Sequence, residues 1–294
     1  MLHFDANREP VAPRDAATVI VLRPGRPDGV EVYCVKRSDK SAFMAGAVAF
    51  PGGKVDASDA DEAWAPLVGA LPERARRLAD PARAATALAI AACRETFEEA
   101  GLLCVRRRGA GAARAAGASE DDVAAARAAL ASGKSLRQAV ADAGLELALD
   151  GLVPFARWVT PAAEARRFDA RFYLVRAPEA HEARVDGHEA TDGFWARPSD
   201  VLARFEAGEL WLAPPTSRKS SSVRDAVDVP SALEIGAAQS LLSVCPEVAS
   251  DASGRVVLTL PGDPEHSLPE ARVAGPSRFV LHDGRFRSAH YEAT

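Results

Sequence analysis

The hydrophobic pattern of the chain predicts strands on both sides of one central helix. Five short runs are rich in β-branched and aromatic residues, as strands are: 16–23, 29–36, 152–159, 168–176 and 190–196. The first two are joined by PGRPDG, whose prolines and glycines favour a hairpin turn. The pattern from Pro81 to Ala100 is helical, and Gly101 follows it as a suitable C-terminal cap. Strands flanking a helix in this way indicate an α/β fold.

Two further features divide the chain. Ser119 stands before three acidic residues and predicts a helix start, so we expect a helical insertion at about 119–145. The polar segment TSRKSSSVRD, residues 216–225, is the best candidate for a boundary. We therefore expect a main domain at 10–217, and an extension at 218–294 with one helix and about three short strands that packs on the same domain.

Composition excludes several classes of protein. The 294 residues are 48% hydrophobic and 26% charged, which is ordinary for a globular chain. The formal charge of −5 argues against a nucleic-acid partner, which would favour a basic excess. No apolar run approaches the length of a membrane span, and MLHFDANREP lacks the organisation of a secretory signal, so we expect no membrane partner and a cytoplasmic location. The four cysteines lack metal-binding spacing and are expected to be buried free thiols.

The strongest candidate for chemistry is the end of the central helix. Helical spacing places Glu95, Glu98 and Glu99 on one narrow face. One interpretation is a solvated acidic face, because like-charged pairs cost little when they are exposed. The other is a cation site, because negative charge at the negative end of the helix dipole needs compensation. Hard carboxylate oxygens suit Mg²⁺ or Mn²⁺, which keep waters and bridge to substrate phosphates.

Two motifs resemble the halves of the Nudix box, whose general form is G-x5-E-x7-R-E-U-x-E-E-x-G-U with U apolar. RETFEEAGL, residues 94–102, resembles its second half, and FPGGKVD, residues 50–56, resembles its glycine turn. Pro51 fixes one dihedral angle and the paired glycines permit backbone shapes that side chains forbid, which predicts a sharp turn. The box, residues 53–102, is interrupted by about 27 extra residues relative to the family pattern.

The interruption leaves the first glutamate of the box unassigned. Asp59 has the right offset from the glycine loop, whereas Thr86 has the right offset from the helix. Thr96 also stands at a position that is usually apolar in the family.

A closer resemblance is to the branch with an interrupted box that includes the nucleoside-diphosphate-linked-moiety-X type 19 proteins, which are coenzyme A and acyl-coenzyme A diphosphatases. Four segments carry it: 36–53, 156–161, 166–175 and 194–202. The coenzyme A signature of the wider family reads roughly R-S-x3-R-x3-G-x3-F-P-G-G. Arg37, Ser38 and Gly46 keep its spacing, and Ala42 stands where the second arginine belongs.

This resemblance implies a Nudix fold, which is a mixed curved sheet between helices, and metal-dependent hydrolysis of a diphosphate in a nucleotide-like small molecule. Coenzyme A or an acyl-coenzyme A is the leading substrate, and ADP-ribose or a dinucleotide is the alternative. A Nudix-fold binding module without hydrolysis is an alternative of another class, motivated by the interrupted box. Nudix proteins often dimerise, so the resemblance leaves a homodimer open.

The resemblance also implies roles for residues of the box. Glu98 and Glu99 would be metal ligands, Glu95 a ligand or the base that activates water, and the Gly52 carbonyl a further ligand. Arg94 would orient a carboxylate by hydrogen bonding.

Outside the box, related enzymes often supply a further glutamate from a late loop. Glu189 is the candidate here, with Asp186 and Asp192 as competitors. Arg37 and Lys54 are weaker candidates for phosphate contacts, because long basic side chains beside glycine turns are commonly surface residues.

Overall fold

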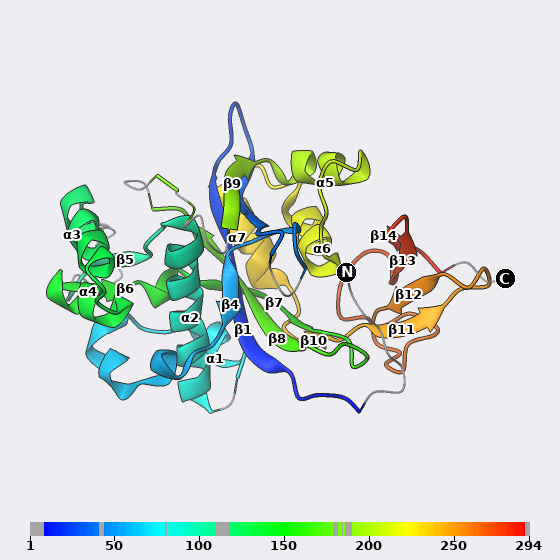
Figure 1. Ribbon diagram of the computed structural model, residues 1–294, viewed down its shortest axis with the longest axis horizontal. Coiled ribbons are helices and arrows are strands. Elements are labelled where there is room, and N and C mark those ends of the chain that lie inside the picture. Colours follow the sequence, from blue (N-terminus) through cyan, green and yellow to red (C-terminus); the bar gives the residue numbers. More distant parts are fainter. Residues whose placement is uncertain are drawn as a thin grey trace.

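A mixed sheet forms the centre of the computed structural model, which describes residues 9–40, 44–79, 81–109, 118–178, 182, 183, 185 and 190–291 (Figure 1). The described strands of this sheet are β1 (Arg14–Pro24), β2 (Val30–Arg37), β3 (Val48–Ala49), β4 (Gly52–Lys54), β7 (Val153–Val159), β8 (Phe168–Arg176), β9 (Ala190–Ala196) and β10 (Ser243–Val244). Their order is β10-β7-β8-β1-β2-β3, while β4 pairs with β1 and β9 pairs with β2. β1 runs parallel to β8 and antiparallel to β2, which confirms the opening hairpin.

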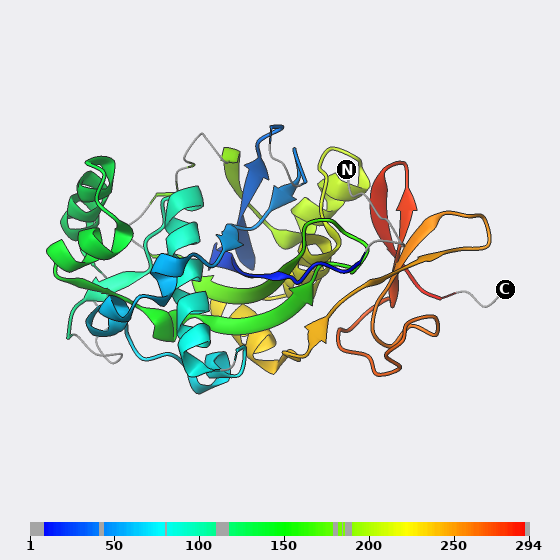
Figure 2. The same ribbon diagram turned by 60° about the horizontal axis from the view of Figure 1, so that its bottom comes forward.

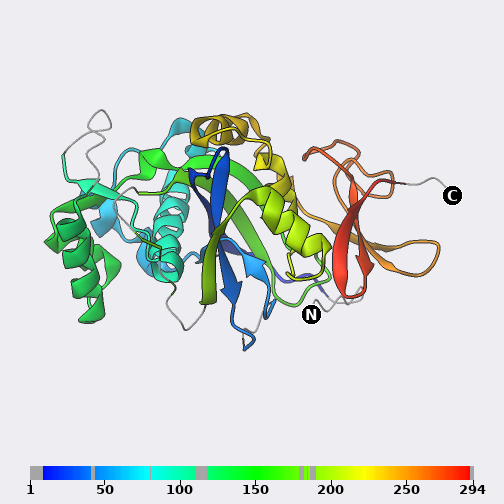
Figure 3. The same ribbon diagram turned by 90° about the horizontal axis from the view of Figure 1, so that it is seen from above.

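The two faces of the sheet bury two separate cores, because alternate residues of a strand point to opposite sides. Val19 and Val21 face α2 (Ala82–Ala100), whereas Ile20 and Leu22 belong to the core on the other face. That second core is covered by α5 (Pro198–Glu206), α6 (Pro214–Val223) and α7 (Val229–Ala238). Figure 3 shows α2 and α6 on opposite sides of the sheet. The expected α/β Nudix architecture is therefore confirmed.

The insertion lies beyond α2, on the side away from the main sheet (Figure 1). Its elements are β5 (Val105–Arg107), α3 (Glu120–Ala131), α4 (Leu136–Asp142) and β6 (Leu145–Leu147), and β5 pairs with β6. Ser119 caps α3 by accepting a hydrogen bond from the Asp122 backbone, as predicted. Four short elements connect the sheet, α2 and the insertion: η1 (Ala57–Ala60), η2 (Glu62–Leu67), α1 (Glu73–Arg76) and η3 (Leu149–Gly151).

The C-terminal residues form a second antiparallel sheet at the opposite end of the molecule from α3 and α4 (Figures 1 and 2). Its strands are β11 (Glu247–Ser250), β12 (Val256–Thr259), β13 (Arg278–His282) and β14 (Arg285–Ala289). Leu258 and Phe279 share the core that contains α6 and α7. Arg218 of α6 donates to the carbonyls of Ala274 (3.1 Å) and Pro276 (2.6 Å), so side-chain hydrogen bonds as well as apolar packing join the extension to the helices.

The polar segment at residues 216–225 is not the exposed connection that its composition favours. Most of it belongs to α6, and Ser217 and Ser220 are buried there. The Ser217 hydroxyl donates to the Pro214 carbonyl and the Ser222 hydroxyl to the Arg218 carbonyl, so the helix backbone itself satisfies these two side chains. The boundary predicted after residue 217 falls inside this helix, and the division into 10–217 and 218–294 stays a prediction.

Two expectations from composition can be compared with the described residues. None of the helices described is both long enough and apolar enough to cross a membrane. The cysteines are free; Cys34, Cys93 and Cys104 are buried, as expected, and Cys245 is half-buried.

Candidate active site

The acidic end of α2 lies against β4. The Gly52 amide donates a hydrogen bond to Glu99 Oε2 at 2.9 Å, although 47 residues separate the two in sequence. Glu95 and Glu99 are only 7% and 5% exposed, while the Glu98 side chain is 52% exposed. A solvated acidic face would leave all three outside, so the burial of Glu95 and Glu99 excludes that interpretation for these two residues.

The two glycines of β4 are required by close approach rather than by an unusual backbone conformation. Neither has a φ in the left-handed region, and both lie in a strand paired with β1. A Cβ atom at Gly52 would collide with the backbone of Ala17 and Thr18, and one at Gly53 would collide with the carboxylate of Glu95. The predicted sharp turn is present, because β3 runs antiparallel to β2 and β4 runs antiparallel to β1, so the chain reverses direction at Pro51. The glycines themselves serve the close approach of β1 and Glu95.

Arg94 uses every donor of its guanidinium, all but one of them on carboxylates. Nη1 donates to Glu95 Oε1 (2.8 Å) and Glu98 Oε2 (2.9 Å). Nε and one Nη2 hydrogen bind the two oxygens of Asp59, both at 2.9 Å, and Nη2 also donates to the Lys54 carbonyl at 3.0 Å. Burial opposes the charge, but the Asp59 hydrogen bond and the neighbouring carboxylates outweigh it and raise the pKa of Arg94 above its ordinary value. Arg94 therefore orients carboxylates, as expected from the resemblance.

Of the two candidates for the first acidic position of the box, Asp59 is the one that contacts Arg94. It lies in η1, is 2% exposed, and also accepts a hydrogen bond from the Asp56 amide at 2.8 Å. Thr86 lies on α2 eight residues before Arg94, roughly 12 Å along the helix axis. The bidentate contact with Arg94 therefore singles out Asp59, whereas the sequence offered two equal candidates.

The carboxylate oxygens are suitable ligands for a hard divalent cation, but they do not form a complete coordination shell by themselves. Among the residues described, no three His, Cys, Asp or Glu side chains are already gathered in a metal-binding cluster. The hydrogen bonds explain this: Arg94 attracts Glu95 and Glu98, while the Gly52 amide attracts Glu99. Mg²⁺ commonly uses one or two carboxylates together with waters and substrate phosphates, so the oxygen donors present fit a cation shared with a substrate.

A cavity of about 880 Å³ opens over these residues. Its lining includes Glu95, Glu98, Glu99 and Gly52, together with Arg37 and Lys54, whose contacts with phosphate stay a prediction. Lys54 forms an ion pair with Asp56 at 2.7 Å, and this hydrogen bond together with nearby Arg94 lowers the pKa of Asp56.

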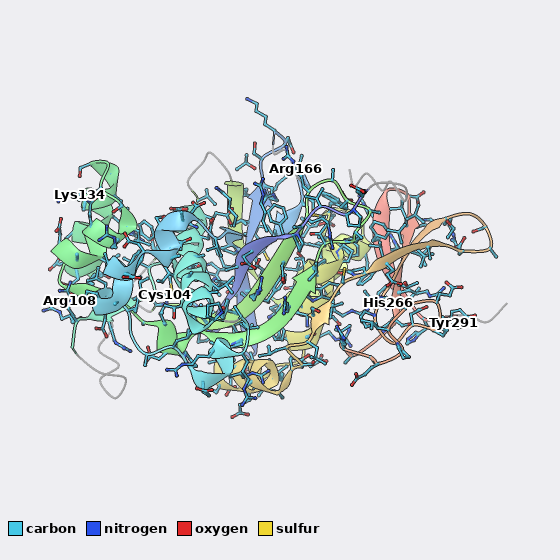
Figure 4. All side chains as sticks on the ribbon, turned by 90° about the horizontal axis from the view of Figure 1, so that it is seen from below. Cys104, Arg108, Lys134, Arg166, His266 and Tyr291 are labelled. Carbon is cyan, nitrogen blue, oxygen red and sulfur yellow. The ribbon has the colours of Figure 1, made fainter. Side chains whose placement is uncertain are left out.

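Three basic residues that line the cavity were missed by the sequence reasoning: Arg14, Arg166 and Arg167. The available signal was an Arg-Arg pair between two predicted strands, which form the β7–β8 hairpin. Figure 4 shows Arg166 beside the central sheet, far from Arg108 and Lys134 on the insertion. Arginine forks are natural partners of phosphate, so the lining supplies groups for an anionic substrate.

Other predicted positions remain without structural evidence. Glu189 and its competitor Asp186 lie outside the described residues, as does Ala42. Asp192 is exposed on β9, opposite Lys36 of β2. The role of Glu189 therefore stays a prediction.

Comparison with known proteins identifies the family of the chain. The family model described as the NUDT19 Nudix domain matches residues 70–219, which include α2 and its acidic end. Acyl-coenzyme A diphosphatase NUDT19 of Gallus gallus is 32% identical over 255 residues, covering 69% of this chain and 65% of that protein. The Homo sapiens protein of the same description is 30% identical over 229 residues, covering 66% and 60%. The chain thus spans somewhat less than two thirds of these relatives.

A solved structure is also similar. The crystal structure of a Nudix hydrolase from Alicyclobacillus acidocaldarius matches with a TM-score of 0.60 and 32% sequence identity, covering 76% of this chain and 96% of that one. At this level of similarity, the fold seen here is the fold of that protein.

Proposed function

Because the chain belongs to the NUDT19 Nudix family, we propose that it is a divalent-metal-dependent diphosphatase acting on coenzyme A or an acyl-coenzyme A. The observation that carries this proposal is the contact between β4 and the end of α2. It places buried Glu95 and Glu99 beside Gly52, at the wall of a cavity that also contains several arginines. The two NUDT19 relatives are described as acyl-coenzyme A diphosphatases, which gives the substrate class.

In the proposed reaction, water attacks one phosphorus of the diphosphate and the bond from that phosphorus to the bridging oxygen breaks. With coenzyme A, the products are adenosine 3′,5′-bisphosphate and 4′-phosphopantetheine. Glu98, Glu99 and the Gly52 carbonyl would hold the cation, which supplies charge neutralisation and a lower pKa for the attacking water when bound.

The protein residues supply orientation and proton transfer. Glu95 is held by Arg94 at 2.8 Å and is buried, so it is the best placed carboxylate to accept the proton that the attacking water loses. Arg94 itself is held by Asp59 and stays charged, and it thereby fixes the positions of Glu95 and Glu98. Arg37 and Arg166 line the cavity and would bind phosphate oxygens, whereas Arg167 already donates from Nε to the Thr160 carbonyl and from Nη1 to the Val11 carbonyl.

The experiment is an assay of hydrolysis products with Mg²⁺ or Mn²⁺ and a panel of coenzyme A, acyl-coenzyme A, ADP-ribose and dinucleotides. We expect cation-dependent cleavage of coenzyme A or its acyl esters, and a loss of about a hundredfold or more in kcat for Glu98→Gln and Glu99→Gln. Glu234→Gln, on the exposed face of α7, is the matched control and should retain activity.

Two results would contradict the proposal. Preferred cleavage of ADP-ribose or a dinucleotide would support the proposed diphosphate hydrolysis but contradict coenzyme A as the substrate. Binding of nucleotides without turnover of any substrate would favour the non-catalytic module.

A further inference from the structure

The floor of the cavity follows a continuous row of residues across four strands. Lys54 of β4 pairs with Ala16 of β1, Ala16 pairs with Ala170 of β8, and Ala170 pairs with Trp158 of β7. Directly paired residues point to the same face of a sheet, and all four line the cavity. Since neighbouring strands are about 4.8 Å apart, Trp158 lies roughly 14 Å across the sheet from Lys54.

The character of the lining changes along this row. The row itself has Lys54 at one end and only the small side chains of Ala16 and Ala170 in the middle. The carboxylates line the same cavity at the β4 end but come from α2, which faces Gly53 on the other side of the strand. Small residues between two large ones leave open space above the floor. The cavity is therefore continuous from the site of chemistry to Trp158.

The far end has an apolar floor, and part of its wall comes from the C-terminal extension, while Arg166 and Arg167 of the β7–β8 hairpin also line the cavity at this end. Trp158 and Phe172 of the main sheet share one core with Leu258 of β12, and all three line the cavity. Pro246, which precedes β11, and Pro215 of α6 complete this part of the lining. Leu258 is 2% exposed and lies outside residues 70–219, the range that the NUDT19 Nudix model matches.

We propose that this far end is a subsite for the acyl chain of an acyl-coenzyme A, and that Leu258 is a residue that determines chain-length specificity. The inference rests on the proposed function, because the diphosphate must sit at the carboxylates for the pantetheine arm to span the roughly 14 Å to Trp158 and bring the acyl group on its terminal sulfur to the far end. The cavity of about 880 Å³ is of the size that encloses a complete small molecule, much more than a diphosphate needs. Burial of an acyl chain favours binding by about fourfold for each methylene group.

The test compares kcat/KM for coenzyme A with kcat/KM for acetyl-, hexanoyl- and lauroyl-coenzyme A. Leu258→Trp fills the far end, so its kcat/KM should fall at least about tenfold more for the lauroyl ester than for coenzyme A. Leu258→Ala enlarges the same space and should shift the preferred chain to a longer one. If Leu258→Trp does not fold, Ala170→Leu provides a second test. It narrows the cavity from the main sheet and should also reduce the preference for long chains.

Leu260→Ala is the matched control, because Leu260 is buried in the same core but does not line the cavity. It should lower the free energy of unfolding without changing the ratio of kcat/KM between lauroyl-coenzyme A and coenzyme A. If Leu258→Trp lowers kcat/KM equally for lauroyl-coenzyme A and coenzyme A, the proposed subsite is wrong. Failure of the wild-type protein to cleave any of these substrates with Mg²⁺ or Mn²⁺ would instead overturn the proposed function, and the subsite with it.

Discussion

At the scale of single residues, the site depends on one close approach. Gly53 leaves just enough space for the Glu95 carboxylate, which Arg94 holds at 2.8 Å. The sequence identified the glycine pair, but a local pattern cannot distinguish a glycine needed for a turn from one needed for space. Only the packing of β4 on α2 reveals that Gly53 serves the second purpose.

Gly53→Ala tests this requirement. The added methyl group must displace the Glu95 carboxylate, so we expect kcat to fall by about a hundredfold, as it does when catalytic groups move by an ångström. Gly151→Ala is the control, because a Cβ there would meet only Val175 Cγ2, at 3.9 Å. Steady-state kinetics measures the effect, and an unchanged kcat in Gly53→Ala with folding intact would contradict it.

Asp59 is the residue that sequence spacing could not choose. A β-turn or helix pattern carries no information about which carboxylate reaches an arginine 35 residues later. The contact is nevertheless the best defined of the site, because both Asp59 oxygens bind Arg94 and both side chains are buried.

Asp59→Asn should therefore destabilise the protein. The change removes a buried negative charge opposite Arg94 and leaves that cation less well compensated, at a cost of about 3 kcal/mol in the free energy of unfolding. Urea unfolding measures this value. Asp225→Asn is the control, since the Asp225 side chain is 86% exposed and its contact with Arg224 should contribute at most about 1 kcal/mol. Similar losses in both variants would refute the role of Asp59.

At the scale of elements, α2 shows what the sequence predicts well. Pro81 and Gly101 mark its ends in the sequence, and in the structure they are its caps, with Gly101 at a φ of 64°. α6 shows the opposite case, because serines and arginines at residues 216–225 indicate a linker by composition alone. Arg218 of this segment is held by Pro276, just before β13, and by Ser288 of β14, some 60 to 70 residues later in the chain, and such contacts are invisible to a local pattern.

The acidic end of α2 also receives help from another element. Arg127 of α3 donates to the Gly101 carbonyl at 2.6 Å, which places a cation at the negative end of the helix dipole. The helical insertion thereby adds a second cation to Arg94, which pairs with Glu95 and Glu98 from within α2 itself.

Arg127→Gln tests this contribution. Loss of the charge at the helix end should reduce the free energy of unfolding by about 1 kcal/mol and speed amide hydrogen exchange in the last turn of α2. Arg137→Gln on the neighbouring helix α4 is the control, because Arg137 instead contacts Asp61, at 3.5 Å. Equal exchange rates in the wild type and Arg127→Gln would show that α3 does not stabilise this end.

At the scale of the whole molecule, α6 joins the main sheet to the extension at an electrostatic cost. Lys219 is 2% exposed, and its ammonium lies 4.6 Å from the ring centroid of Phe155 in β7. Burial, with a further contribution from neighbouring Arg218, lowers the pKa of Lys219 from 10.5 to about 8. The apolar packing that connects the two sheets therefore includes a cation that the folded state disfavours.

This cost predicts a stability that changes with pH. Between pH 8 and 10.5 the unfolded chain binds more protons at Lys219 than the folded chain, so the free energy of unfolding should rise with pH across that window. Below pH 8 both states are protonated and the full cost of about 3 kcal/mol is present. Lys219→Met removes the charge, so it should be more stable than the wild type at pH 7, and the difference should shrink towards pH 10.5. Lys134→Met, at an exposed position of the insertion, is the control and should keep the wild-type dependence of stability on pH. A stability difference between Lys219→Met and the wild type that is the same at all pH values would contradict the lowered pKa of Lys219.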